Sequence, residues 1–207
     1  MKSAHEAIGL HHVPGFLDGA EVAAVIDLVR GICRAAPLRV PSTASGQPLK
    51  LKVASAGAWG WWADVGGYRY IDKHPTTGQP WPAIPAELLD ICARGLARVG
   101  HTPMTPDSLL INHYDESGSL GLHIDRTEED LDAPIVSLSI GADAVFLIGG
   151  EEREDKTTPI VLSSGDLLVQ GGRSRHLFHG IKKLLPTLTS PLTGMQRINL
   201  TFRKVKR

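Results

Sequence analysis

A histidine and an aspartate stand two positions apart in the segment Leu122-His123-Ile124-Asp125. On extended backbone, residues i and i+2 point to the same side, so both side chains can bind one ion. A third ligand would complete the set of two histidines and one carboxylate that holds ferrous iron and leaves positions open for other ligands. The pair therefore predicts part of a metal centre.

The best candidate for the third ligand is His179, in Phe178-His179-Gly180, where the glycine would let the backbone turn tightly beside a site. His176 is less suitable, because the two arginines just before it would put cations next to the metal. A His-x-Asp pair alone is weak evidence. The alternative is a surface hydrogen bond between His123 and Asp125, with His179 as a buried, satisfied histidine.

The segment Arg197–Arg203 reads as a strand with one apolar and one polar face. Its apolar residues are Ile198, Leu200 and Phe202, and its polar residues are Arg197, Asn199, Thr201 and Arg203. Arginines make bidentate, charge-assisted bonds to carboxylates, so two of them beside an amide predict a dicarboxylate site. By the same alternation Leu110, Asn112 and Tyr114 share a face that could complete it. A solvated sheet face is the other interpretation.

Two helices are expected in the first half of the chain. One begins after Asp18, with Glu21 three residues on as in a capping box, and ends before Pro37. Pro85 opens the other, and Gly100 stands where a left-handed residue ends a helix.

Short strand-like runs separated by turns follow Pro106. They are Leu109–Tyr114, Ile135–Ile140, Ala144–Gly149, Ile160–Leu162, Leu167–Gln170 and Arg197–Phe202. Strands at this spacing after two helices predict an α+β fold with a sandwich or jelly-roll barrel. If the chain were divided into two domains near residue 105, the second half would leave one face of its sheet uncovered. Residues 1–207 are therefore expected to form a single domain.

The composition is that of an ordinary globular protein, with 42% hydrophobic and 21% charged residues. Twenty-two basic residues balance 22 acidic ones, so contact with a polyanion requires a local basic patch. Cys33 and Cys92 lie in apolar helical patterns and are expected in the core. No apolar run approaches the roughly 18 residues of a membrane span, and a cytoplasmic protein without membrane contact is expected.

Seven segments, taken in order, resemble the AlkB family of Fe(II)/2-oxoglutarate dioxygenases, and closely its bacterial DNA-repair branch. They are Gly60-Trp61 with Gly67-Tyr68-Arg69-Tyr70, Pro80-Trp81-Pro82-Ala83-Ile84-Pro85, Leu110-Ile111-Asn112-His113-Tyr114, Leu122-His123-Ile124-Asp125, Ala133-Pro134-Ile135-Val136-Ser137-Leu138-Ser139, Phe178-His179-Gly180 and Arg197-Ile198-Asn199-Leu200-Thr201-Phe202-Arg203. The match covers most of the chain, and its closing Arg-x-Asn-x-Thr-Phe-Arg is the most specific part.

The resemblance implies a double-stranded β-helix (jelly-roll) barrel flanked by N-terminal helices and a nucleotide-recognition lid near residues 38–82. It implies Fe(II) held by His123, Asp125 and His179, with O₂ and 2-oxoglutarate as co-substrates. It assigns 2-oxoglutarate binding to Asn112, Tyr114, Arg197, Asn199 and Arg203. The implied reaction is oxidative demethylation of bases such as 1-methyladenine and 3-methylcytosine, a direct-reversal repair that releases formaldehyde, succinate and CO₂.

The same resemblance places substrate contacts at Trp61, Tyr68, Arg69, Tyr70, Thr127 and Arg153. Core packing is the alternative for the aromatic residues and is expected for Trp62 and Trp81, and an exposed turn arginine is the alternative for Arg153. Because the methyl group lies on the pairing edge of the base, the base must be unpaired or flipped, stacking on Tyr68, Trp61 or His123. Alkylated single-stranded DNA, and RNA, are the expected partners of a monomer.

Three positions depart from the bacterial pattern: His113 replaces an arginine, Gln170 a tryptophan and Thr127 an acidic residue. The acid helps to read the base in the family, and Glu128 next to Thr127 is a candidate substitute. Backbone contacts could come from Lys182, Lys183, Lys204, Lys206 and Arg207, or these could form a solubilising surface.

Two other function classes are open. One is a hydroxylase of the same fold that acts on a protein or a small molecule, which the aromatic lid argues against. The other is a non-enzymatic binding module, which would have lost a ligand or an arginine, and none is lost here.

Overall fold

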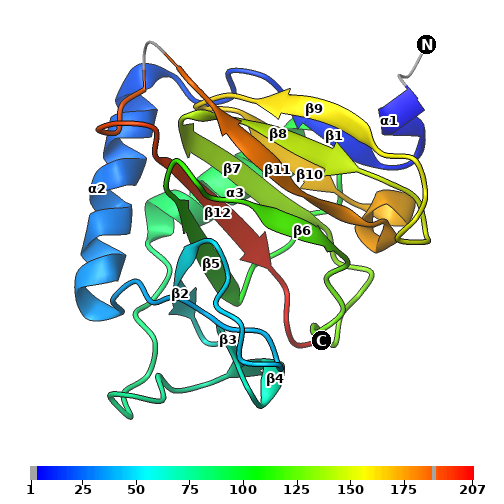
Figure 1. Cartoon of the computed structure of the whole chain (residues 1–207). Helices are drawn as coiled ribbons and strands as arrows, with labels where there is room; N and C mark the ends of the chain where they lie inside the picture. Colours follow the sequence, from blue (N-terminus) through cyan, green and yellow to red (C-terminus); the bar gives the residue numbers. More distant parts are fainter. Residues whose placement is uncertain (1–3, 188–189) are drawn as a thin grey trace.

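Two packed antiparallel sheets, a separate hairpin and two long helices make up the fold of the computed structural model, which describes residues 4–187 and 190–207 (Figure 1). The major sheet has the order β1 (Leu10–Val13), β10 (Leu167–Gln170), β7 (Ile135–Gly141), β12 (Arg197–Arg203), β5 (Ser108–Tyr114) and β2 (Lys52–Gly57). The minor sheet has the order β6 (Leu120–His123), β11 (His179–Leu185), β8 (Asp143–Ile148) and β9 (Thr158–Leu162). This arrangement is the expected jelly-roll.

The remaining elements are α1 (Ala4–Ala7), α2 (Gly19–Ala35), α3 (Ala86–Arg98), the 3-10 helix η1 (Gly172–His176), and the hairpin β3 (Gly60–Asp64) and β4 (Gly67–Ile71). The hairpin lies at one end of the sandwich, below β2 and β5 in Figure 1. Both expected helices are confirmed. Asp18 and Glu21 form the predicted capping box, and Gly100 has a φ of 68° just beyond α3.

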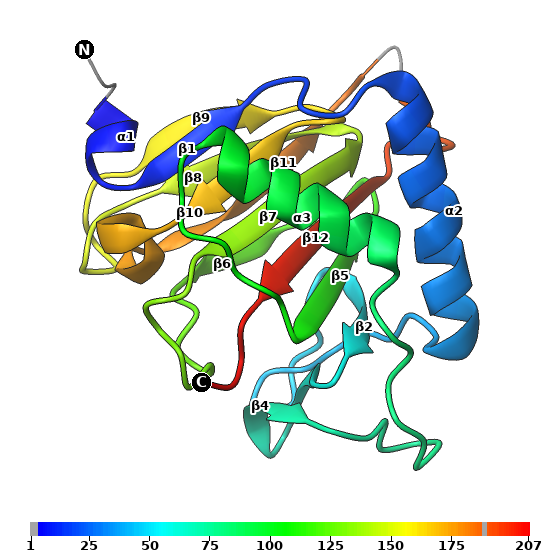
Figure 2. The same ribbon diagram turned by 180° about the vertical axis from the view of Figure 1, so that it is seen from behind.

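One hydrophobic core lies between the helices and the outer face of the major sheet, which α3 crosses in Figure 2. Cys92 is fully buried there, and Cys33 is half-buried against the same core, as expected. Ile198, Leu200 and Phe202 point into this core from β12, which confirms the apolar face of that strand. A second core, with Phe146, Ile148 and Leu168 among its members, fills part of the space between the sheets.

The opposite face of β12 is the one that the sequence assigned to a polar site. Its register with β5 sets Arg197 opposite Tyr114 and Asn199 opposite Asn112. Arg197 and Arg203 are buried, so the interpretation of a solvated face is wrong.

Six strands were not anticipated: β1, β2, β3, β4, β6 and β11. Trp81 is buried as expected, but Trp62 is only half-buried, with the Arg39 guanidinium 3.5 Å from its ring centroid. Among the described residues, no helix is long and apolar enough to cross a membrane.

Candidate metal centre

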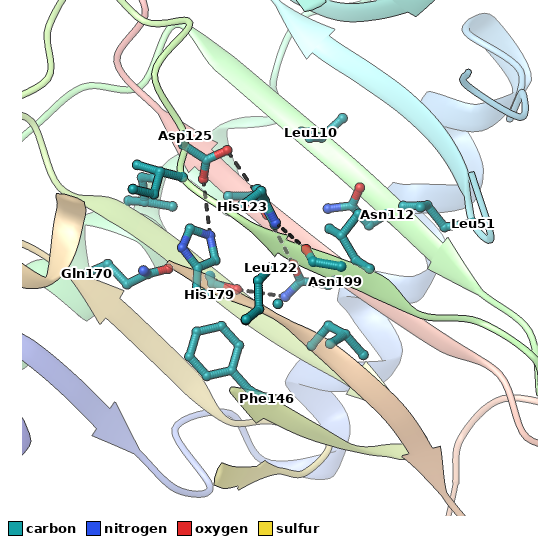
Figure 3. Close-up of a pocket in the computed structure, with 18 of the residues that line it drawn as sticks. Leu51, Leu110, Asn112, Leu122, His123, Asp125, Phe146, Gln170, His179 and Asn199 are labelled. Carbon is teal, nitrogen blue, oxygen red and sulfur yellow. Dashed lines mark hydrogen bonds and ion pairs between the residues drawn. The ribbon is translucent and has the colours of Figure 1, made fainter. Parts of the chain in front are cut away.

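A cavity of about 350 Å³ opens between the major and minor sheets (Figure 3). Twelve of the residues singled out from the sequence line it: Trp61, Tyr68, Asn112, Tyr114, His123, Asp125, Thr127, Arg153, His179, Arg197, Asn199 and Arg203. Arg69 and Tyr70 are outside this lining set. The fold thus brings the two ligand segments, the polar face of β12 and part of the hairpin to one place.

His123, Asp125 and His179 form the one cluster of potential metal ligands found among the described residues, with ligand atoms within 4.8 Å of one another. Nε2 of His179 lies 3.4 Å from Oδ2 of Asp125, and Nε2 of His123 lies 3.9 Å from Oδ1. His123 ends β6 and His179 begins β11, two strands that pair at these residues. Neighbouring strand ends therefore supply both imidazoles.

Backbone carbonyls fix the orientation of both rings. The Nδ1 of His123 lies 2.9 Å from the Gly121 oxygen, and the Nδ1 of His179 lies 3.1 Å from the Leu177 oxygen. Nδ1–H donation to these acceptors leaves both Nε2 atoms free for a metal, as in the outer shells of many metal sites. The groups present fit a ferrous ion.

Gly180 does not turn the chain as the sequence suggested, because it lies inside β11. A Cβ at this position would lie 2.5 Å from the Leu120 oxygen and 3.0 Å from the Gly121 oxygen. The glycine is needed because β6 and β11 approach closely beside His179.

The electrostatics of the cluster favour its metal-binding forms. Burial, and then the neighbouring His179, lower the pKa of His123 to about 4, so this imidazole is neutral at physiological pH. Burial alone would raise the pKa of Asp125, but the Arg203 guanidinium, His179 and His123 together outweigh it and hold that pKa well below its usual value. A neutral imidazole and a carboxylate are the forms that ligate metals.

Behind Asp125 lies a buried ionic network that the sequence did not reveal. Arg203 Nη1 is 2.9 Å from Asp125 Oδ2 and 2.6 Å from Glu128 Oε1. Glu128 also accepts hydrogen bonds from Arg175 at 3.2 Å and from the Tyr70 hydroxyl at 2.9 Å. Glu128 is therefore occupied inside the protein and, unlike Thr127, does not line the cavity.

Arg197 has a different environment. Its side chain is fully buried, and no carboxylate lies within 4 Å of it among the described residues. Its Nε has no hydrogen-bond partner there, as is also true of the Arg203 Nε. Nη2 donates to the Ser139 hydroxyl at 2.7 Å. Burial lowers the pKa of Arg197 to about 10, which leaves it charged at neutral pH. An uncompensated cation facing a cavity is costly unless an anion joins it, so this environment fits a carboxylate ligand.

Asn199 of β12 and Tyr114 of β5 differ in whether their side chains are free to bind a ligand. The Asn199 amide donates to Ser137 Oγ at 2.7 Å and to the Leu138 oxygen at 3.1 Å, and its Oδ1 accepts from Thr201. It therefore braces β12 against β7. The Tyr114 phenol is buried, and burial raises its pKa, so it remains a neutral hydrogen-bond donor.

The hairpin brings an aromatic pair to the mouth of the cavity. The rings of Trp61 and Tyr68 stack with centroids 5.7 Å apart and 21° between their planes. Arg69, on the same hairpin, is paired with Asp64 at 2.8 Å. Arg153 lies in the loop after β8 of the minor sheet, with its guanidinium 5.1 Å from the Phe178 ring centroid.

Comparison with known proteins agrees with this geometry. The model of the 2OG-Fe(II) oxygenase superfamily matches residues 9–203. The "Alpha-ketoglutarate-dependent dioxygenase AlkB homolog" of Caulobacter vibrioides is 40% identical over 193 residues, which are 93% of this chain and 86% of that protein. This chain belongs to the AlkB family of 2OG-Fe(II) oxygenases.

Two further relatives show how widely this AlkB-family domain occurs. The "tRNA demethylase abh1" of Schizosaccharomyces pombe is 37% identical over 158 residues, which are 70% of this chain and 52% of that protein. The solved structure of OsALKBH1 superimposes with a TM-score of 0.81 at 28% identity, covering 95% of this chain and 98% of that one. Enzymes of the superfamily use Fe(II), 2-oxoglutarate and O₂.

The three departures from the bacterial AlkB pattern lie in or beside the cavity. Thr127 is exposed and lines it, so no carboxylate stands at that position. Gln170 is buried in the lining and donates weakly to the Ser174 oxygen at 3.5 Å. His113 points away from the cavity and lies 3.3 Å from the Gln196 amide oxygen.

Proposed function

We propose that this AlkB-family protein oxidatively removes alkyl groups from N-alkylated bases such as 1-methyladenine and 3-methylcytosine in single-stranded DNA or RNA. One observation carries the proposal: a single cavity contains a His-Asp-His cluster, a buried arginine with no carboxylate partner in the described part of the chain, and a stacked aromatic pair at its mouth. These are the sites that a metal, a dicarboxylate and a flat base require.

In this proposal His123, Asp125 and His179 hold Fe(II). Arg197 binds a carboxylate of 2-oxoglutarate, with Tyr114 and Asn112 as hydrogen-bonding neighbours on the facing strand. The support is that Arg197 has no carboxylate within 4 Å among the described residues, and that the strand register sets Tyr114 opposite it. Arg203 and Asn199 were expected to bind 2-oxoglutarate too, but their present partners favour a role in orienting Asp125 and β12.

The alkylated base enters between the hairpin and the metal ligands. Trp61, Tyr68 and the half-exposed His123 provide flat surfaces for it, and base stacking on such rings is worth about 1–3 kcal/mol. Thr127 and Arg153 also face the cavity and are the proposed polar contacts of the nucleotide. Arg69 and Tyr70 act indirectly, through Asp64 and Glu128, by holding the hairpin in place.

Bound Fe(II) supplies the coupling of O₂ to 2-oxoglutarate, which yields succinate and CO₂ and oxidises the alkyl carbon. The residues of the chain orient the co-substrate and bring the methyl carbon within reach. The methyl carbon gains a hydroxyl group, after which its bond to nitrogen breaks. The electron pair of that bond returns to the base, the hydroxyl proton is lost, and formaldehyde leaves.

We further propose that residues 1–207 act as one catalytic domain, with residues 38–82 as its lid. The support is the position of Trp61 and Tyr68 at the mouth of a cavity that both sheets of the sandwich line.

The test is mass spectrometry of single-stranded oligonucleotides that carry 1-methyladenine or 3-methylcytosine, incubated with protein, Fe(II), ascorbate and 2-oxoglutarate. Loss of one methyl mass only in the presence of 2-oxoglutarate supports the proposal and ranks the bases. Succinate without a change in the oligonucleotide would indicate a different substrate, such as a protein or a small molecule. Absence of succinate under all conditions would contradict the enzymatic function itself.

A further inference from the structure

The net charge of the chain is zero, so a nucleic-acid strand needs local cations that are not already neutralised. Several lysines named from the sequence do not meet this condition. Lys204 lies 3.4 Å from Asp107, and Lys206 is paired with Glu129 and also covers the Trp59 ring. Lys182 and Lys183 are exposed on β11 but do not line the cavity.

Free cations lie instead along a shallow groove of about 100 Å³ beside the mouth of the cavity. The groove is lined by Val40, Leu49, Lys50, Leu51, Lys52, His113, Asp115 and Ser117. The groove is adjacent to the cavity, because Leu49 and Leu51 line both. Neither Lys50 nor Lys52 has a carboxylate within 4 Å in the part of the chain that the structure describes.

Asp115 is the single acidic residue of the groove, and its carboxylate is already engaged. One oxygen accepts the backbone N–H of Ser117 at 3.0 Å and the Ser117 hydroxyl at 2.8 Å. Asp115 keeps its single negative charge in these bonds, while Lys50 and Lys52 carry two positive charges, so the groove has a net positive charge.

Two arginines, Arg126 and Arg153, line the cavity itself. Figure 3 shows Leu51 and Asp125 at opposite ends. Lys50 and Lys52 flank Leu51 in the chain, and Arg126 follows Asp125. Arg126 and Arg153 are exposed members of the cavity lining, without a carboxylate within 4 Å among the described residues. A nucleotide whose base fills the cavity would have positive charge on both sides.

We infer that the groove of Lys50 and Lys52 binds the phosphodiester backbone of the single strand whose alkylated base occupies the cavity, while Arg126 and Arg153 face the strand on the far side. This inference rests on the proposed function. A basic groove beside a stacking site is the arrangement by which proteins follow a single strand without reading its sequence. Since DNA and RNA share the phosphodiester, the groove serves both.

The test compares the full chain carrying Lys50→Gln with Lys52→Gln against a control carrying Lys182→Gln with Lys183→Gln. Both double variants remove two exposed charges without breaking an ion pair among the described residues. Fluorescence anisotropy gives the Kd of labelled DNA and RNA oligonucleotides, with and without one 1-methyladenine, over a range of salt concentrations. Thermal melting checks that both variants are folded.

The groove variant should bind about tenfold more weakly at low salt, and the slope of log Kd against log salt should fall by about 1.4, which is about 0.7 for each of the two lysines. The loss should be equal for methylated and unmethylated strands, since phosphates carry no information about the base. A groove variant that binds like the control would overturn the inference and leave the proposed function intact. If the wild-type protein neither binds nor demethylates any strand, both are overturned.

Discussion

The guanidinium of Arg203 lies 2.9 Å from the carboxylate of Asp125, so a buried cation holds the candidate metal ligand from behind. The same nitrogen contacts Glu128, and Arg203 therefore already has two anionic partners within the protein. Arg197, six residues earlier on the same face of β12, has none within 4 Å among the described residues. Loss of one arginine should therefore affect the protein differently from loss of the other.

Replacing Arg197 by Gln is expected to weaken 2-oxoglutarate binding by about tenfold to a hundredfold, the value of a hydrogen bond to a charged group. The protein should remain folded, because no carboxylate of its own loses a partner. The dissociation constant can be measured with Mn(II) in place of Fe(II). Unchanged affinity would contradict the assignment of Arg197 to the co-substrate.

Replacing Arg203 by Gln is expected to lower the free energy of unfolding by about 3–5 kcal/mol, because the Asp125 carboxylate would lose its only arginine partner among the described residues and Glu128 would keep only Arg175. Urea denaturation of this variant beside Arg197→Gln makes the comparison. Equal stability of the two would show that the Arg203 network contributes little to the fold.

Replacing Asp125 by Ala should abolish metal binding and turnover together, since it removes the carboxylate of the cluster. Asp132→Ala, an exposed aspartate outside the cavity lining, is the matched control. Co(II) absorption reports metal binding independently of activity. Full activity of the Asp125 variant would rule out this metal assignment.

Thr127 gives a test of base selection. Introducing Asp there should raise kcat/KM for 3-methylcytosine by about tenfold, because a carboxylate accepts a hydrogen bond from the exocyclic amine. The same change should lower activity on 3-methylthymine, which offers a carbonyl at that edge. Parallel changes for the two bases would mean that Thr127 does not contact this edge.

Asp166 makes a pH prediction. Although burial opposes it, bonds from His12 and from the backbone N–H groups of Ser163 and Gly15 lower the pKa of this carboxyl. Its contribution to stability is then present above the unfolded pKa of about 3.9 and is lost as the pH falls toward the lower folded pKa. Urea unfolding should be measured between pH 7 and pH 3 for the wild type and for Asp166→Asn. The difference between their free energies of unfolding should become smaller below about pH 4. If this difference in the free energy of unfolding does not change with pH, Asp166 stabilises the fold through packing and not through its charge.

The sequence predicted those elements whose signals are local. The capping box of α2 and the alternation of β12 are written in consecutive residues, and both are confirmed. The strands β6 and β11 were missed, because four residues ending in a metal ligand and a segment containing Lys182 and Lys183 show no clean alternation. Their pairing is visible only in three dimensions.

The Glu128 network could not be predicted for the same reason. Its members Tyr70, Glu128, Arg175 and Arg203 are far apart in the chain, and each taken alone reads as a surface residue or as a ligand contact. Glu128 was considered as a reader of the base only because it follows Thr127. The expectations of a monomer and of a cytoplasmic protein stay predictions.

The two faces of β12 have a consequence for how this domain can change over time. Helix packing and the polar cavity wall share one run of seven residues, so inserting or deleting a single residue would exchange the two sets of side chains at once. Such a change would put arginines against α2 and α3 and would unfold the protein. Proteins that evolve from this sequence can therefore lose the polar residues of the cavity through single substitutions. A one-residue insertion or deletion in β12 would instead cost them the fold.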